Sequence, residues 1–173
     1  ESRGLGDVYK RQILASTWGG YIRFGKGLAH NVRTKTTIYV PDYRLGPESK
    51  YPSQLNDALT VYEYLLNEKT YKSNQIAFGG DSAGGNLALV ALLKLIDTDN
   101  DLPTSLALLS PWTDLTGTGT TYTENMADRD LLLGPIFKRI WANGDSLHGF
   151  YINEGEFDSN NPYMVPLLSL IHI

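Results

Sequence analysis

Hydrophobic positions along the chain fall into two patterns, short continuous runs and stripes spaced by three and four residues. Runs at residues 36–40, 75–78 and 105–109 are apolar or β-branched and end at proline, glycine or serine, which predicts three strands. After Pro52 and Ser53, which suit a helix start, the apolar positions follow helical spacing. These positions are Leu55, Ala58, Leu59, Tyr62, Leu65 and Leu66. Residues 83–96 are apolar almost all the way round, which predicts a helix buried against a sheet.

None of the three predicted strands alternates polar and apolar residues, as a strand with one solvent-exposed face would. Continuous apolar runs are typical of parallel strands that are covered on both faces. Strands and helices also alternate along the chain, which indicates βαβ units with right-handed crossovers. The sequence therefore predicts an α/β fold, a mostly parallel sheet with helices on both faces.

Composition and charge narrow the possible functions. The chain has 173 residues, close to one domain, with 42% hydrophobic residues and a net charge of −4, so nucleic-acid binding and adhesion to a membrane surface have no electrostatic support. There is no cysteine for a disulfide, a thiolate metal site or a nucleophile. The longest apolar run, residues 87–93, is too short for a membrane span. We expect a cytoplasmic protein whose chemistry comes from hydroxyl, imidazole or carboxylate groups.

Both ends of the chain differ from the rest. Residues 1–12 and 169–173 resemble translated sequencing-adapter sequence, so we exclude them from arguments about the fold. Residues 13–168 are then expected to be an internal part of a longer protein, which leaves open whether a signal peptide preceded them.

The residues Gly80-Asp81-Ser82-Ala83-Gly84 fit the pattern G-x-S-x-G, between a predicted strand and a predicted buried helix. On such a turn the serine is expected to adopt a strained conformation with its hydroxyl held above the sheet. A Cβ at Gly80 or Gly84 is expected to collide with the neighbouring strand and helix. The N–H of Ala83, at the helix N-terminus, is a candidate oxyanion-hole donor. The alternative is a plain helix cap, which would explain neither glycine.

Three motifs together resemble the hormone-sensitive-lipase-like α/β-hydrolases, the bacterial family IV esterases. They are GGDSAGGN at residues 79–86, DYRLGPE at residues 42–48 and SPWTDL at residues 110–115. The resemblance implies a partial α/β-hydrolase fold and a serine hydrolase that cleaves small carboxylic esters through an acyl-enzyme on Ser82. The nucleophile elbow would comprise Gly80, Asp81, Gly84 and Gly85. Neither a cofactor nor a metal is called for.

The resemblance also implies parts that this sequence does not carry. The family's HGGG loop falls where residues 7–12 stand, and its triad acid and histidine would follow Pro166. We therefore expect the parent protein to be active and this chain alone to be inactive and prone to aggregate. His148 is interpreted as a loop histidine, His30 as the end of a surface helix, and His172 as part of the adapter-like tail.

The flanking motifs are interpreted as scaffold. Arg44 and Glu48 are expected to pair, Trp112 and Asp114 to close a turn near the site, and Tyr43 to pack. Two other functions stay open: a non-catalytic member of the fold that binds a small molecule, and an amidase or peptidase. Acyl and alcohol preference, a lid and the oligomeric state cannot be read from the sequence.

Overall fold

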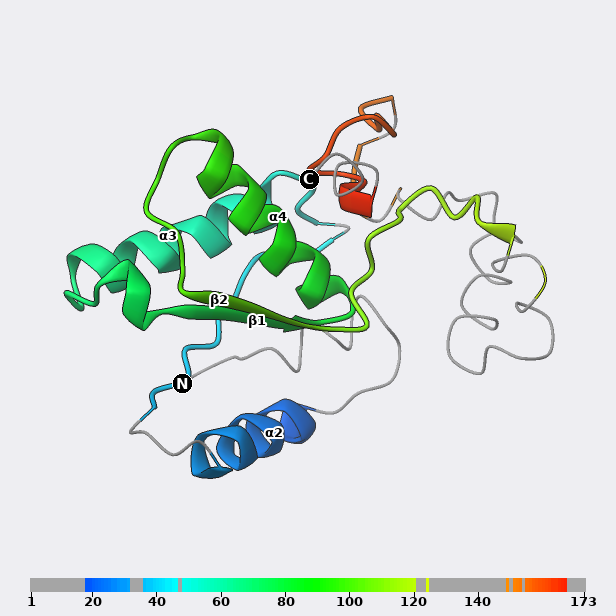
Figure 1. Ribbon diagram of the computed structural model, residues 1–173. Coiled ribbons are helices and arrows are strands. Elements are labelled where there is room, and N and C mark those ends of the chain that lie inside the picture. The colour runs from blue at the N-terminus through cyan, green and yellow to red at the C-terminus, as the bar shows by residue number, and fades with distance from the viewer. Residues whose placement is uncertain are drawn as a thin grey trace.

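A pair of parallel strands and the helices around it organise the part of the chain that the computed structural model describes, residues 18–31, 36–46, 48–120, 124, 149, 151–153 and 155–167. The elements in chain order are α2 (Trp18–Asn31), α3 (Ser53–Asn67), the 3-10 helix η1 (Ser73–Gln75), β1 (Ala77–Asp81), α4 (Ala83–Asp97) and β2 (Ser105–Leu109) (Figure 1). The order strand, helix, strand from β1 to β2 confirms the predicted α/β unit.

The two strands pair in parallel, with Ala77 opposite Ser105 and Asp81 opposite Leu109. Helix α4 is the connection between them and contacts both strands. Strand β2 has the predicted bounds, whereas β1 begins at Ala77 because the chain just before it turns. The Ile76 amide donates to the Ser73 carbonyl at 3.1 Å, which closes η1. The carboxyl ends of both strands therefore lie at the same edge of the sheet.

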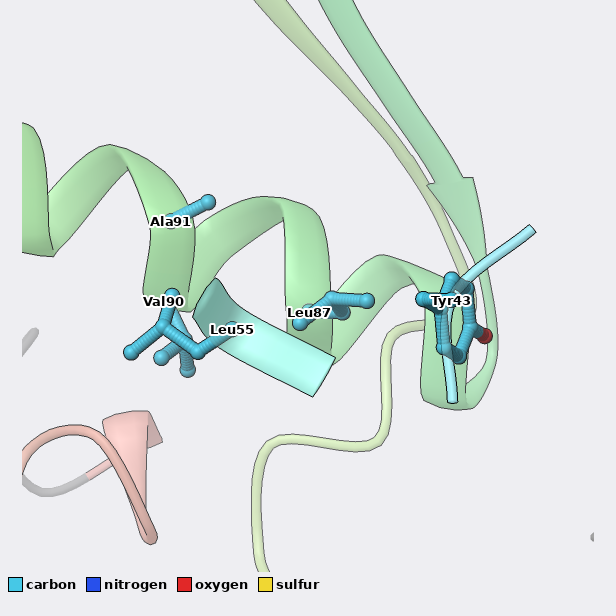
Figure 2. Packing of buried hydrophobic residues seen from close by; sticks show 5 residues of the cluster. All are labelled: Tyr43, Leu55, Leu87, Val90 and Ala91. Atoms are coloured by element: carbon cyan, nitrogen blue, oxygen red, sulfur yellow. The ribbon is translucent and has the colours of Figure 1, made fainter. Parts of the chain in front are cut away.

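Helices α3 and α4 pack against each other on one side of the sheet (Figure 1). The stripe predicted on α3 is confirmed, because its members Leu55, Tyr62 and Leu65 are buried. One core cluster consists of Tyr43, Leu55, Leu87, Val90 and Ala91. Figure 2 shows Leu55 against α4 near Val90, and Tyr43 beside the end of β1. This core fixes the start of α4 relative to the end of β1.

The other face of the sheet is not covered in the same way. Along β2, Ser105, Ala107 and Leu109 are exposed, whereas Leu106 and Leu108 are partly buried. Helix α2 lies on the side of the sheet opposite α4 (Figure 1), yet these alternate side chains stay accessible. The prediction of strands buried on both faces is therefore wrong for the exposed face of β2.

The predicted strand at residues 36–40 is also wrong. The segment has no strand assignment, and Ile38, Tyr39 and Val40 are 38%, 37% and 49% exposed. A β-branched run forms a strand only where another strand offers its backbone, and within the described part of the chain β1 pairs only with β2. The segment is instead held by side chains, because Tyr39 meets Tyr71 edge to face with ring centroids 6.1 Å apart.

Residues 155–167 form turns that pack against the loop after β2. Leu115, Ile152, Met164 and Val165 make a separate core cluster. The Leu167 amide donates to the Thr113 carbonyl at 3.1 Å. These residues form no strand, and irregular chain thus completes the core on this side.

Candidate active site

Ser82 is the single residue between the end of β1 and the start of α4. Its backbone angles are φ 54° and ψ −117°, a conformation that L-residues other than glycine rarely adopt. Such a residue costs on the order of 1–3 kcal/mol and persists only where its surroundings hold it. The strained turn predicted from the sequence is confirmed.

Both backbone groups of Ser82 are hydrogen-bonded to neighbouring segments. Its N–H donates to the Leu109 carbonyl at 2.9 Å, and its carbonyl accepts from the amides of Asn86 and Trp112, each at 3.0 Å. The side chain is partly exposed and makes no capping hydrogen bond to the first turn of α4. Ser82 thus occupies the N-cap position of α4 without capping the helix through its side chain, so a plain side-chain cap is contradicted.

Two glycines let the strand, the turn and the helix approach closely. A Cβ at Gly80 would lie 2.1 Å from the carbonyl oxygen of Gly84 and 2.6 Å from the Gly85 nitrogen. A Cβ at Gly85 would lie 3.0 Å from Pro111, in the loop after β2. The collision predicted at Gly84 is wrong, because nothing lies within 4 Å of a Cβ built there. Gly84 faces open space, and the second close approach belongs to Gly85.

The amide of Ala83 is the first of α4. The first hydrogen bond of the helix ladder runs from Asn86 N–H to Ser82 C=O, so the amides before Asn86 precede that ladder. The positive end of the helix dipole adds to their attraction for negative charge. A partly buried carboxylate, Asp81, ends β1 on the other side of the serine.

The loop after β2 supports this turn from the side. The side-chain amide of Asn86 donates to the Trp112 carbonyl at 2.7 Å, and the Thr116 amide donates to Asp114 Oδ1 at 2.8 Å. The structural role predicted for Trp112 and Asp114 is confirmed. Sequence reasoning assigned no function to Asn86, although a polar residue inside an apolar helix was a signal to examine it.

Arg44 pairs with a residue that the sequence did not indicate. Its Nε and Nη2 bind the two carboxylate oxygens of Asp57 on α3, at 2.9 and 2.7 Å, in place of the predicted partner Glu48. The guanidinium lowers the pKa of the Asp57 carboxyl below its ordinary value, against an opposing effect of burial. This pair ties the DYRLGPE segment to α3, and the buried Tyr43 packs as predicted.

His30 is the one histidine in the part of the chain that the structure describes. His30 is exposed in the last turn of α2, as expected for the end of a surface helix. His148, His172 and the adapter-like segments 1–12 and 169–173 lie outside the described residues. Where the structure describes the chain, no cluster of His, Cys, Asp or Glu could hold a metal, and no helix is long and apolar enough to cross a membrane.

Sequence comparisons show that this chain is similar to hydrolases. A family model described as the alpha/beta hydrolase fold matches residues 23–171. An acetyl-hydrolase of Streptomyces hygroscopicus is 40% identical over 110 residues, which are 61% of this chain and 36% of the relative. An esterase of Acinetobacter venetianus is 37% identical over 128 residues, 70% of this chain and 42% of that protein.

Solved structures agree with the sequence relatives. A crystal structure of an esterase from the bacterial hormone-sensitive lipase family is 34% identical, with a TM-score of 0.58 over 73% of this chain and 39% of that one. A hormone-sensitive lipase from a metagenome library is 33% identical, with a TM-score of 0.60 over the same shares. The chain thus spans about two fifths of the length of these relatives.

Proposed function

Because the chain belongs to the α/β hydrolase fold family, we propose that its protein is a serine hydrolase that cleaves small carboxylic esters through an acyl-enzyme on Ser82. The observation that carries the proposal is the strained conformation of Ser82, a partly exposed residue whose side chain takes no part in capping α4. An ordinary helix start does not need a residue in a strained backbone conformation. A nucleophile does, because this conformation makes its side chain accessible to the substrate. Relatives named esterase and acetyl-hydrolase support a small ester as substrate.

In this mechanism Ser82 Oγ attacks the ester carbonyl carbon. A histidine takes the hydroxyl proton and returns it to the leaving alcohol, while a carboxylate holds that imidazole in the correct tautomer. Water then attacks the acyl-enzyme by the same route and releases the acid. We assign the histidine and the carboxylate to residues that follow Pro166, as the motif resemblance implies.

The oxyanion of the tetrahedral intermediate would bind the Ala83 amide. This N–H is free of the α4 ladder and lies at the positive end of the helix. One such donor contributes about 3–4 kcal/mol to the transition state. We assign a second donor to the family's glycine loop, at the position where the adapter-like residues 7–12 stand in this sequence. Gly80 and Gly85 permit the close packing that aims the amide.

Hydrolysis of a short nitrophenyl ester by the full-length protein tests the proposal. Ser82→Ala is expected to lower kcat/KM by at least about 10⁴-fold with the fold retained, because nothing replaces the nucleophile. Ser105→Ala is the matched control, because Ser105 is an exposed serine at the opposite end of β2, and it is expected to leave the rate unchanged. The 173-residue chain alone is expected to give no turnover.

Other results would select another function. A Ser82→Ala variant that retains the wild-type rate would refute the assignment. Turnover of amides in preference to matched esters would indicate an amidase or peptidase. Saturable binding of esters with no turnover would indicate a non-catalytic binding member of the fold.

A further inference from the structure

The strain at Ser82 raises the question of what holds the residue in place. Residues 109–112 supply part of the answer, because Leu109 accepts from the Ser82 amide and Trp112 donates to the Ser82 carbonyl. Ser110 itself has a positive φ of 43°, so the chain turns sharply as it leaves β2 and passes the start of α4. The loop after β2 therefore holds the serine only if the loop itself is fixed.

Asn86 connects this loop to the serine. It is only 4% exposed on the first turns of α4, and its side-chain amide donates to the Trp112 carbonyl at 2.7 Å. Its backbone amide donates to the Ser82 carbonyl at 3.0 Å. One residue thus binds both the nucleophile and the loop that holds the nucleophile. We call this ring of hydrogen bonds among Ser82, Asn86, Leu109 and Trp112 the elbow clamp.

The start of α4 also lies close to the loop after β2 next to the clamp. The Cα and Cβ of Pro111 lie 3.0 Å from the position that a Cβ would take on Gly85. A side chain at position 85 would push the loop and the start of α4 apart by a few tenths of an ångström, so the two segments are closely packed here. The Asn86 amide is well suited to this site because a short, rigid donor reaches the carbonyl with few rotatable bonds.

Resting on the proposed function, we infer that Asn86 is a positioning residue for the acylation step. Through the elbow clamp it holds Ser82 Oγ and the Ala83 amide in the geometry of attack without touching the substrate. Loss of its side-chain donor would free the loop at residues 109–112 and let Ser82 relax. Misplacement by about 1 Å costs on the order of 100-fold in rate. Substrate binding, which uses other surfaces, would change little.

The full-length protein tests this inference with two matched variants. Asn86→Leu removes the donor and keeps the number and branching of the side-chain heavy atoms. Gln54→Leu is the control, because Gln54 is 1% exposed and donates a side-chain amide to the Ser49 carbonyl at 2.7 Å, away from Ser82. Active sites are titrated with an organophosphonate, and the acylation rate and KM for a nitrophenyl ester are expressed per titrated site.

We expect Asn86→Leu to lower the acylation rate per titrated site by about 10- to 100-fold with KM changed less than about threefold. Gln54→Leu is expected to keep both constants within about twofold. Equal per-site rates for Asn86→Leu and the wild type would overturn the inference, as would a rise in KM that accounts for the whole loss. If Asn86→Leu does not fold, Asn86→Ala, which adds no branched bulk, is measured in the same way.

A separate readout distinguishes this inference from the proposed function. Hydrogen exchange at the Ser82 amide reports its bond to Leu109 whether or not the protein turns over an ester. We expect exchange at Ser82 at least about tenfold faster in Asn86→Leu than in Gln54→Leu. Unchanged protection in Asn86→Leu would exclude the clamp. Faster exchange in Asn86→Leu, together with a wild-type protein that has no esterase activity, would refute only the proposed function.

Discussion

Replacing Gly80 with alanine tests how tightly the turn at Ser82 is built. The added Cβ would lie 2.1 Å from the Gly84 carbonyl oxygen and 2.3 Å from its carbon. Real Cβ contacts are almost never shorter than 3.0 Å, so the first turn of α4 must move by about 1 Å. Both atoms belong to the helix backbone, so no side-chain rotation can relieve the contact.

The size of the effect follows from this displacement. Overpacking in a closely packed region costs typically about 1–3 kcal/mol, and a backbone clash lies at the upper end. In a full-length protein of the size of the relatives, each kcal/mol lowers Tm by less than the about 2–4 °C typical of 150–250 residues, so Gly80→Ala is expected to lower Tm by a few degrees. A shift of about 1 Å at the start of α4 would also lower the esterase rate on the order of 100-fold.

Gly84→Ala is the control for this experiment. Its Cβ meets nothing within 4 Å, and alanine is favoured over glycine in a helix by up to about 1 kcal/mol. Thermal denaturation followed by circular dichroism, with ester hydrolysis on the same samples, gives both readouts. If Gly80→Ala melts and turns over like the wild type, or if Gly84→Ala is the more damaging change, the account of the turn is incorrect.

Two further pairs of measurements address the scaffold. Arg44 lowers the pKa of Asp57, so this carboxylate contributes stability above the ordinary Asp pKa of about 4 and loses it as the pH falls through the lower folded pKa. In urea titrations the difference between wild type and Asp57→Asn should therefore shrink on acidification; a difference independent of pH would contradict the pairing. Tyr62→Phe should cost about 1 kcal/mol because its hydroxyl donates to the Asp101 carbonyl at 2.9 Å. Tyr151→Phe should be neutral or stabilising in thermal denaturation, since its buried hydroxyl has no partner in the described part of the chain, and an equal cost for both would refute this.

The parts of the site that depend on local sequence could be predicted. The glycines around Ser82, the apolar strand before it and the apolar helix after it specify a tight strand-to-helix turn, and the structure has that turn. The bounds of β2 and the start of α3 followed equally from turn residues and hydrophobic spacing. In each case the information lies within a few residues of the feature it determines.

Features that depend on distant partners could not be predicted. Arg44 binds Asp57, thirteen positions away, because α3 brings that carboxylate to it. The run at residues 36–40 has strong strand propensity but pairs with neither described strand. The function of Asn86 is visible only once the loop after β2 lies beside α4. Pairing and packing across the fold decide these positions, and spacing along the chain does not reveal them.

Covalent labelling tests the central claim most directly. The full-length protein is treated with an organophosphonate ester, digested, and analysed by mass spectrometry to locate the modified residue. A nucleophilic serine at the strained turn predicts one phosphonylated residue, Ser82, with loss of esterase activity in proportion to labelling. Complete inactivation with the label on any other residue, and with Ser82 unmodified, would contradict the account.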